Sequence, residues 1–196
     1  MSNKPLNSPL QPGDGHPTPA KAWGHFRTIT RHKILVGKLC FRVGLYRQGF
    51  MHDWSKYAPV EFCAGVKYYQ GYRSPNAAER LDKGYSAAWL HHKGRNKHHF
   101  EYWMEPSIDG SGQVLSHPMP MRYVVEMFCD RVAASKIYKG ADYTDRTALE
   151  YLLNSKEYAV MHPDTYTQIV ELLTMLAEQG EEHTLNYIKH QIVEKL

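Results

Sequence analysis

Several features that would place the chain in a membrane or outside the cell are missing from the sequence. It has no run of about 18 apolar residues, and no apolar segment follows the lysine near its N-terminus. We therefore expect no membrane span, no secretory signal, no membrane partner and a cytoplasmic location. The 196 residues suffice for one domain with a sizeable core, or for one domain with a small appendage.

Cysteine is also scarce. The three cysteines, Cys40, Cys63 and Cys129, are isolated from one another and lie among apolar or aromatic residues. They lack the C-x-x-C spacing of a zinc ribbon or a thiol redox site. We predict that all three are reduced residues of the core.

Sustained strand alternation and internal repeats are absent, and helical spacing is found instead. From residue 22 onward, six residues recur at steps of four and three: His25, Ile29, His32, Val36, Leu39 and Val43. Such steps line side chains along one helix face, so this face is expected to point inward. Further helices are predicted over residues 46–53, 59–70, 86–92, 97–103, 121–138, 148–155, 163–179 and 181–196. Residues 73–84 are expected to form a loop with a helical turn, and residues 106–120 a loop or a lid. The fold class predicted is all-α.

Charge and proline content divide the chain into parts. Residues 1–20 hold five of the 11 prolines and are expected to form a disordered leader. Residues 1–140 carry 20 Lys+Arg and 10 Asp+Glu, whereas residues 141–196 carry 4 and 10. A basic, histidine-rich segment suggests an anionic partner such as nucleic acid or a phosphorylated small molecule, and an unevenly charged surface is the simpler alternative. We predict a helical domain over 21–140 and a helical extension, packed on it, over 141–196.

Histidines and aspartates with metal-ligand character follow one another along the basic part. Their order is His32, then His52-Asp53, then His91 or His92, then His98 or His99, then Asp130. Imidazole and carboxylate ligands suit divalent metals of intermediate hardness, and a two-metal site needs about four His and two Asp. Each of these residues lies on a predicted helix or at its end. All could therefore project into the centre of a helical bundle.

This order, H…HD…H…H…D, resembles the HD-domain superfamily of metal-dependent phosphohydrolases. The string H-D-W-S-K at residues 52–56 is similar to the H-D-x-G-K version of the HD-GYP branch. Residues 91–96, H-H-K-G-R-N, resemble that branch's H-H-E-x-x-D-G segment. However, Lys93 stands where a Glu is usual and no G-Y-P follows, which argues against cyclic-dinucleotide hydrolysis.

Three longer strings resemble an uncharacterised, mainly bacterial family of small proteins, over about residues 23–143. They are R-Q-G-x-x-H-D-x-S-K-Y at residues 47–57, W-L-H-H-K-G-R-N-K-H-H-F-E-Y-W at 89–103 and D-R-x-A-A-S-K at 130–136. These strings are long and specific, so they strongly indicate membership. The family supplies no activity, so the functional prediction depends on the HD-like arrangement.

The HD-like resemblance implies a set of metal ligands. The primary divalent ion would be held by His32, His52, Asp53 and Asp130, with Asp53 as the bridge to a second ion. The second ion would take one histidine from each pair. His92 and His98 flank the Gly94 break most closely and are favoured, with His91 and His99 as reserves. His25, seven residues before His32 on the same stripe, is an alternative to His32. One or two ions are expected, and Mn, Fe, Mg, Co, Ni and Zn all suit these ligands.

The same resemblance implies a phosphohydrolase that acts on a nucleotide or other small phosphate ester. Bound ions lower the pKa of a bridging water and neutralise charge on a phosphoryl oxygen. Asp53, Lys56 and Glu101 are the residues with predicted catalytic roles. Lys56 would bind a phosphate oxygen or protonate the leaving group, and Glu101 would hold an imidazole. Further substrate-binding candidates are Arg95, Lys97 and Lys136.

Two other functions fit the same residues. An HD-type di-iron oxygenase would use the same ligands to activate oxygen. A nucleic-acid-binding helical module with a structural metal would instead use the four histidines, the cations and the aromatic residues of 89–103 as a contact strip. Trp89, Phe100 and Trp103, however, lie at spacings typical of helix packing.

Overall fold

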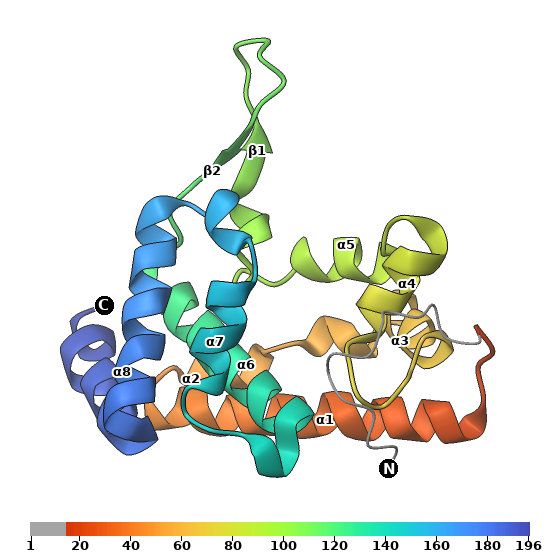
Figure 1. Ribbon diagram of the computed structural model, residues 1–196, viewed down its shortest axis with the longest axis horizontal. Helices are drawn as coiled ribbons and strands as arrows, with labels where there is room; N and C mark the ends of the chain where they lie inside the picture. Colours follow the sequence, from red (N-terminus) through yellow and green to blue (C-terminus); the bar gives the residue numbers. More distant parts are fainter. Residues whose placement is uncertain (1–14) are drawn as a thin grey trace. The chain divides into compact units, whose positions relative to one another are not determined.

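A computed structural model describes residues 15–196 of the chain (Figure 1). The α-helices are α1 (Pro19–Arg42), α2 (Tyr46–Met51), α3 (Pro59–Lys67), α4 (Pro75–Lys83), α5 (Ala87–Lys93), α6 (Met121–Lys139), α7 (Thr147–Asn154) and α8 (Pro163–Tyr187). Short helical turns are η1 (Trp54–Tyr57), η2 (Phe100–Trp103), η3 (Gly140–Asp142), η4 (Glu157–Ala159), η5 (Ile188–Ile192) and η6 (Val193–Lys195). The predicted all-α fold is confirmed.

The described chain forms two compact units. The first comprises the chain up to Ile34 together with Asp53–Asn96, and the second comprises Leu35–His52 together with Lys97–Leu196. The division predicted between residues 140 and 141 stays a prediction. Residues 1–14 of the predicted leader lie outside the described residues, and Pro19 and Ala20 form the start of α1. Among residues 15–196, no helix is long and apolar enough to cross a membrane.

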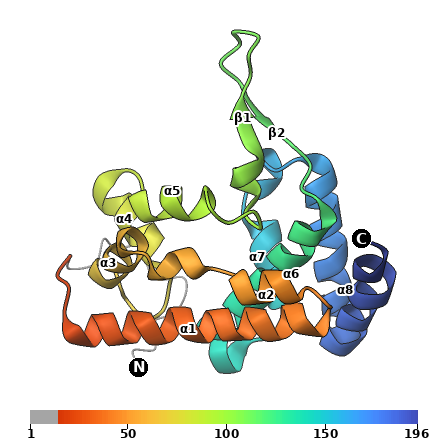
Figure 2. The same ribbon diagram turned by 180° about the vertical axis from the view of Figure 1, so that it is seen from behind.

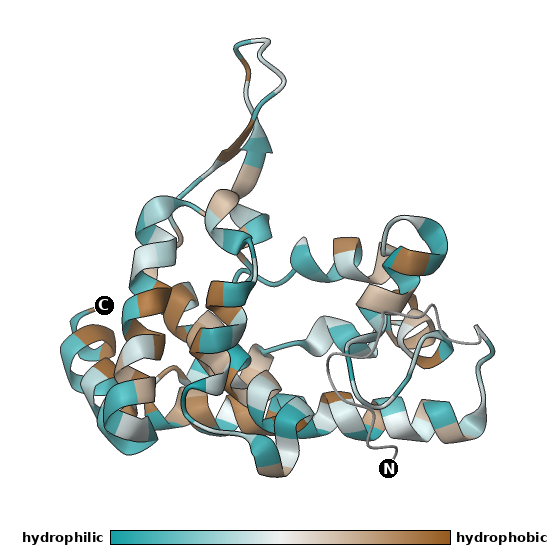
Figure 3. Ribbon diagram, viewed as in Figure 1, coloured by the Kyte–Doolittle hydropathy of each residue, from teal (hydrophilic) through white to brown (hydrophobic). Residues whose placement is uncertain are grey.

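The second unit is organised around α6, α7 and α8, which lie side by side (Figure 1). Their apolar residues, brown in Figure 3, join those of residues 36–45 in one hydrophobic cluster. The stripe predicted on α6 is confirmed, since Val124, Val125, Phe128 and Val132 are all buried. This helix also carries Glu126, a charged residue that is buried beside the apolar stripe.

Gly180 interrupts α8, at the position where a break between the helices 163–179 and 181–196 was predicted. Its φ of 81° and ψ of 168° lie in a region that is essentially restricted to glycine. Helical structure resumes after it, and Leu185 and Ile188 pack into the hydrophobic cluster.

The first unit contains α3, α4 and α5, which lie side by side in Figure 2. The segment predicted as a loop, 73–84, is instead the helix α4. Pro75 occupies its first turn, and Gly84, with a φ of 79°, ends it. The next helix is fastened to α4 through Glu79, which is 1 % exposed. Glu79 accepts hydrogen bonds from Ser86 Oγ at 2.6 Å and from the Ala88 amide at 3.3 Å.

The inward face predicted for α1 is confirmed, because all six residues of that stripe are buried. His25 packs against Phe62 and Tyr69 within the first unit. It also lies so close to α3 that a Cβ at Gly65 would fall 2.1 Å from its Nε2 atom. Only glycine fits at residue 65 without moving that ring.

The segment after α5 departs most from its prediction. Of the helix expected over 97–103, only residues 100–103 are helical, as the short η2; turns precede it and β1 (Met104–Pro106) follows it. This strand pairs in antiparallel fashion with β2 (Val114–Ser116), inside the segment expected to be a loop. Asn96 does not cap a helix, because its Nδ2 donates to the His92 carbonyl and to Ser55 Oγ. The hairpin tip and β2 expose Ile108, Val114 and Leu115.

The cysteine prediction is confirmed for two residues of the three. Cys40 and Cys129 are fully buried in the second unit, whereas Cys63, on α3, is exposed. The surroundings of Cys63 in the sequence are apolar, but its place on α3 turns it toward solvent. All three thiols are free.

Candidate metal centres

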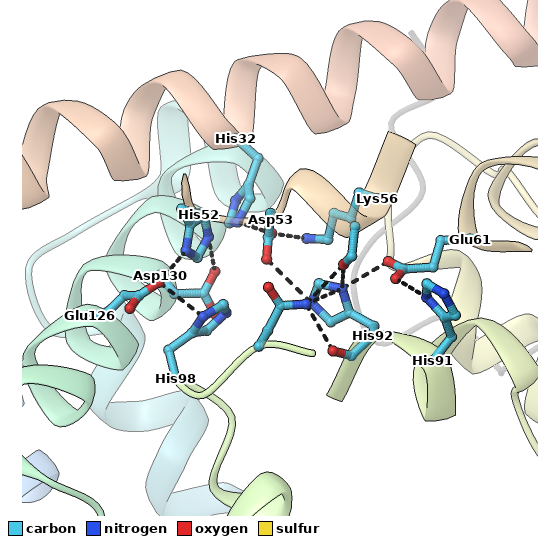
Figure 4. Close-up of polar contacts among 12 residues, drawn as sticks. His32, His52, Asp53, Lys56, Glu61, His91, His92, His98, Glu126 and Asp130 are labelled. Atoms are coloured by element: carbon cyan, nitrogen blue, oxygen red, sulfur yellow. Dashed lines mark hydrogen bonds and ion pairs between the residues drawn. The ribbon is translucent and has the colours of Figure 1, made fainter. Parts of the chain in front are cut away.

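Asp53 is the central residue of a buried set in the first unit (Figure 4). It precedes η1 with a φ of 55°, and it is the one described residue other than glycine with a positive φ. One carboxylate oxygen lies 3.4 Å from His32 Nε2, and the other lies 3.3 Å from His92 Nε2. His32 comes from α1 and His92 from the last turn of α5. The first set is therefore His32, Asp53 and His92, brought together from three segments.

A second carboxylate, Glu61 in the first turn of α3, holds the two histidines of α5. The Nδ1 atoms of His91 and His92 lie 2.6 and 2.8 Å from its two oxygens. An ionised carboxylate only accepts hydrogen bonds, so both Nδ1 atoms are protonated and the lone pair of His92 is on Nε2, toward Asp53. Burial alone would raise the pKa of Glu61, but the bonds from His92 and His91 outweigh it and lower that pKa.

Lys56 lies beside the first set. Its Nζ is 2.5 Å from Asp53 Oδ2, one turn of η1 after the aspartate. Burial of the ring, together with the positive charge of Lys56, lowers the pKa of His92. His92 is therefore a neutral imidazole near pH 7, which is the form that coordinates metals.

The second unit contains an analogous set around Glu126 of α6. Its Oε1 lies 3.0 Å from the Nδ1 atoms of both His52 and His98 (Figure 4). Asp130 follows Glu126 by four residues on the same helix, and its Oδ1 lies 3.5 Å from His52 Nε2. Burial alone would raise the pKa of Glu126, but the hydrogen bonds from His52 and His98 lower it. The second set is therefore His52, His98 and Asp130, with Glu126 behind both rings.

Both sets have the donor chemistry of a divalent metal site. Neutral imidazoles and carboxylates are the ligands that Mn, Fe, Co, Ni and Zn share. Two ligand atoms of one ion at about 2.1 Å lie roughly 3.0–3.4 Å apart, close to the 3.3–3.5 Å between imidazole and aspartate here. One atom each from His52, His98 and Glu126 also lies within 4.8 Å of the other two. The grouping of His52, His98 and Glu126 could hold a metal ion.

The six predicted ligands thus divide evenly between the two units. His52 and Asp53 are consecutive in the chain but belong to different sets. The distribution of the six between a primary and a second ion, with Asp53 as the bridge, stays a prediction. His25, the alternative to His32, packs against Phe62 and Tyr69.

The remaining candidates lie around the two sets. Among the reserve ligands, His91 is bound to Glu61, and the ring of His99 packs 4.2 Å from that of His98. Arg95 is exposed in the first unit and donates to the His91 carbonyl. Lys97 lies over the rings of Tyr102 and Tyr123.

The predicted roles of two further site residues of the second unit stay predictions. Glu101 is half-buried in η2, and the carboxylate on His98 Nδ1 belongs to Glu126. Lys136 forms an ion pair with Glu181 and lies over the ring of Tyr143. The proposed phosphate contact of Lys136 would require that pair to open.

Sequence reasoning missed both supporting carboxylates. Glu126 could have been found from the sequence, because it is a charged residue within an apolar stripe and lies four residues before Asp130, on the same face of the helix. Glu61 follows a proline at a helix start, where an acidic residue is common for reasons of the helix dipole alone, so its role could not be read from the sequence.

Comparison with known proteins places the chain in a family. Residues 21–175 match the model of a protein family described as a family of unknown function, DUF5662. The match covers well over half of the chain, so the protein belongs to this family. No curated protein and no solved structure gives a significant match.

Proposed function

We propose that the protein is a metal-dependent phosphohydrolase that acts on a nucleotide or other small phosphate ester. One observation carries the proposal: in each unit a buried glutamate accepts from Nδ1 of a histidine whose Nε2 lies near an aspartate. Such carboxylate–histidine pairs are typical of metal ligands, because the outer carboxylate fixes the tautomer and orientation of the ring.

In the first unit, His32, Asp53 and His92 would hold a divalent ion. In the second unit, His52, His98 and Asp130 would do the same. A bound divalent ion lowers the pKa of water and neutralises charge on a phosphoryl oxygen. Glu61 and Glu126 would fix the tautomer and the orientation of the rings that they contact.

Lys56 favours a phosphate ester over an uncharged substrate. Its ammonium group lies 2.5 Å from an oxygen of Asp53 and is 28 % exposed. It is therefore placed both to contact a phosphoryl oxygen at the first set and to donate a proton from Nζ to the departing oxygen. The order of the ligands in the chain, which resembles that of the HD-domain phosphohydrolases, supports the same reaction.

The test begins with the metal content. The full chain is expressed with added Mn or Fe, its metal is measured by elemental analysis, and phosphate release is measured on a panel of nucleotides and simple phosphate esters. Asp53→Asn and His92→Gln should lose metal and lower phosphate release by about 100-fold or more. His117→Gln is the matched control, because His117 is exposed on the hairpin and pairs with Glu105; it should retain both.

Two results would contradict the proposal. One is a metal-loaded protein that releases phosphate from no member of the panel; iron-dependent oxygen consumption by that protein would instead favour the oxygenase. The other is phosphate release that persists unchanged in Asp53→Asn.

A further inference from the structure

A row of four aromatic side chains, three exposed and one half-buried, lies in the first unit, outside the proposed metal ligands. Trp23 and Phe26 come from α1, and Trp54 and Tyr57 come from η1; we name these four the aromatic strip. The rings of Trp23 and Phe26 stack at 5.8 Å, Phe26 meets Tyr57 at 6.2 Å, and Tyr57 meets Trp54 at 5.8 Å. The four rings therefore follow one another without a break.

Tryptophan and phenylalanine are rarely as exposed as they are in the aromatic strip. Trp23 is 62 % exposed, Trp54 is 48 % exposed and Phe26 is 39 % exposed. Large aromatic side chains are mostly buried when nothing else requires them at the surface, and contiguous exposed apolar area marks binding surfaces. The hydroxyl of Tyr57 is also fixed, since it lies 3.0 Å from Thr30 Oγ1 of α1. The strip is thus both open and held in place.

Positive charge accompanies the rings. The 24 residues of α1 include no aspartate or glutamate, so no acidic side chain of this helix neutralises its cations. Arg27 and Arg31 are exposed on the part of α1 in the first unit. The Nζ of Lys33 lies 4.6 Å from the centre of the Trp54 ring. One cation thus lies over a ring of the strip, and two further exposed arginines are carried by the same helix as Trp23 and Phe26.

We propose that the aromatic strip binds single-stranded nucleic acid. Unpaired bases stack on aromatic side chains without regard to sequence, while the phosphates between them require cations, and this surface supplies both. A duplex hides its base faces, so it would meet only the cations. A membrane surface would favour an uninterrupted apolar face, which the arginines of α1 do not leave.

This surface differs from the 89–103 strip considered from the sequence. Phe100 and Trp103 of that segment pack against the hydrophobic cluster of the second unit. The aromatic strip is also connected to the first metal set through η1, where Trp54 follows Asp53 and Tyr57 follows Lys56. Binding to the strip does not rest on the proposed phosphohydrolase activity.

The binding test uses the full chain, fluorescently labelled oligo-dT and oligo-U of about 15 nucleotides, and EDTA, so that no metal is needed. Fluorescence anisotropy gives the affinity for each strand and for a duplex of equal length. Trp23→Ala and Trp54→Ala should each weaken single-strand binding by roughly five- to hundredfold. Trp23→Phe should keep most of the affinity, because a ring remains. Tyr158→Ala, which removes a 60 % exposed ring of the second unit, should change nothing.

The cations have a separate readout. Arg27→Gln combined with Arg31→Gln should reduce the slope of log affinity against log salt by about 1.4, since each phosphate contact of a single strand contributes about 0.7. The proposal is overturned if the wild-type chain binds neither oligonucleotide, or if the tryptophan variants bind as well as the wild type. A membrane-binding strip would give a third contrary result. In that case the wild type would bind vesicles containing phosphatidylserine, the tryptophan variants would not, and the oligonucleotide would fail to displace the vesicles.

Discussion

The second unit buries one large hydrophobic cluster, whereas the first buries more polar side chains than apolar ones. In the first unit the buried apolar residues are Ile29, Val66, Tyr68, Ala78 and Ala88. Its buried polar residues include both histidines of α1, His92 of α5 and the glutamates of α3 and α4. Hydrophobic burial therefore stabilises the second unit, and the first depends on satisfied hydrogen bonds and ion pairs.

The supporting glutamates show the same difference. Glu61 holds two consecutive histidines at the end of one short helix, α5. Glu126 lies within the apolar stripe of α6 and holds His52 and His98, which are far apart in the chain. In both units one carboxylate thus binds two imidazole rings. Glu61 does so among polar residues, and Glu126 does so within a hydrophobic core.

The largest expected effect tests the hydrophobic dependence of the second unit. Leu173 of α8 is fully buried, so Leu173→Ala should lower the free energy of unfolding by about 2–5 kcal/mol. Leu153→Ala is the control, because that leucine of α7 is 54 % exposed, and it should have little effect. Urea denaturation measures both; equal effects would show that the cluster is not the main source of stability.

The next effect tests the polar first unit through pH. Burial, with the charge of Lys56, lowers the pKa of His25 from 6.5 to about 4. The unfolded chain binds a proton below pH 6.5 and the folded chain does not, so His25 should lower stability by up to about 3 kcal/mol as the pH falls from 6.5 to 4. His25→Gln should lose this part of the pH dependence in urea denaturation. A variant with the same pH profile as the wild type would contradict it.

A smaller effect distinguishes the two glutamates. Glu61→Gln and Glu126→Gln should each weaken metal binding by about 10–100-fold, measured by competition with a chelator. The loss should be larger for Glu126→Gln, because Glu126 orients two proposed ligands and Glu61 orients one. An equal or larger loss in Glu61→Gln would instead make His91 a ligand beside His92.

The smallest effect concerns helix capping in the first unit. Ser86 accepts a hydrogen bond from the Trp89 amide at the start of α5 and donates one to the buried Glu79, so Ser86→Ala should lower the free energy of unfolding by about 1–2 kcal/mol. Ser74 occupies the same position before α4 but makes no such bond through its side chain. Ser74→Ala should therefore change stability by a few tenths of a kcal/mol, and a matching loss would remove capping as the cause.

Much of the fold follows from local signals in the sequence. The stripes of α1 and α6, Pro163 at the start of α8 and the break at Gly180 were all predictable, because periodicity, proline and glycine act within a few residues. The helix α4 also has such signals in Pro75 and Gly84, but its polar composition concealed them. Residues 97–103 could not be assigned correctly, because the chain there is diverted into a hairpin whose partner strand begins at Val114.

The candidate metal ligands could be predicted from the sequence, but the contacts of the glutamates that hold their imidazole rings could not. The order of histidines and aspartates names residues that the structure gathers into two buried sets. Which carboxylate stands behind each imidazole depends on packing between segments distant in the chain, as with Glu126 and His52. No spacing rule connects residues that are brought together only by the tertiary fold.

The left-handed backbone at Asp53 has a consequence for which substitutions the chain can accept. Only glycine, asparagine and aspartate adopt a φ near 55° readily. Residue 53 must therefore fulfil two independent requirements: it must adopt a positive φ, and it must supply a carboxylate. Gly would satisfy the first requirement, Glu would approach the second, and Asn would keep the turn while removing the charge. In a saturation library, folding at this position should tolerate three amino acids, whereas metal binding should tolerate one.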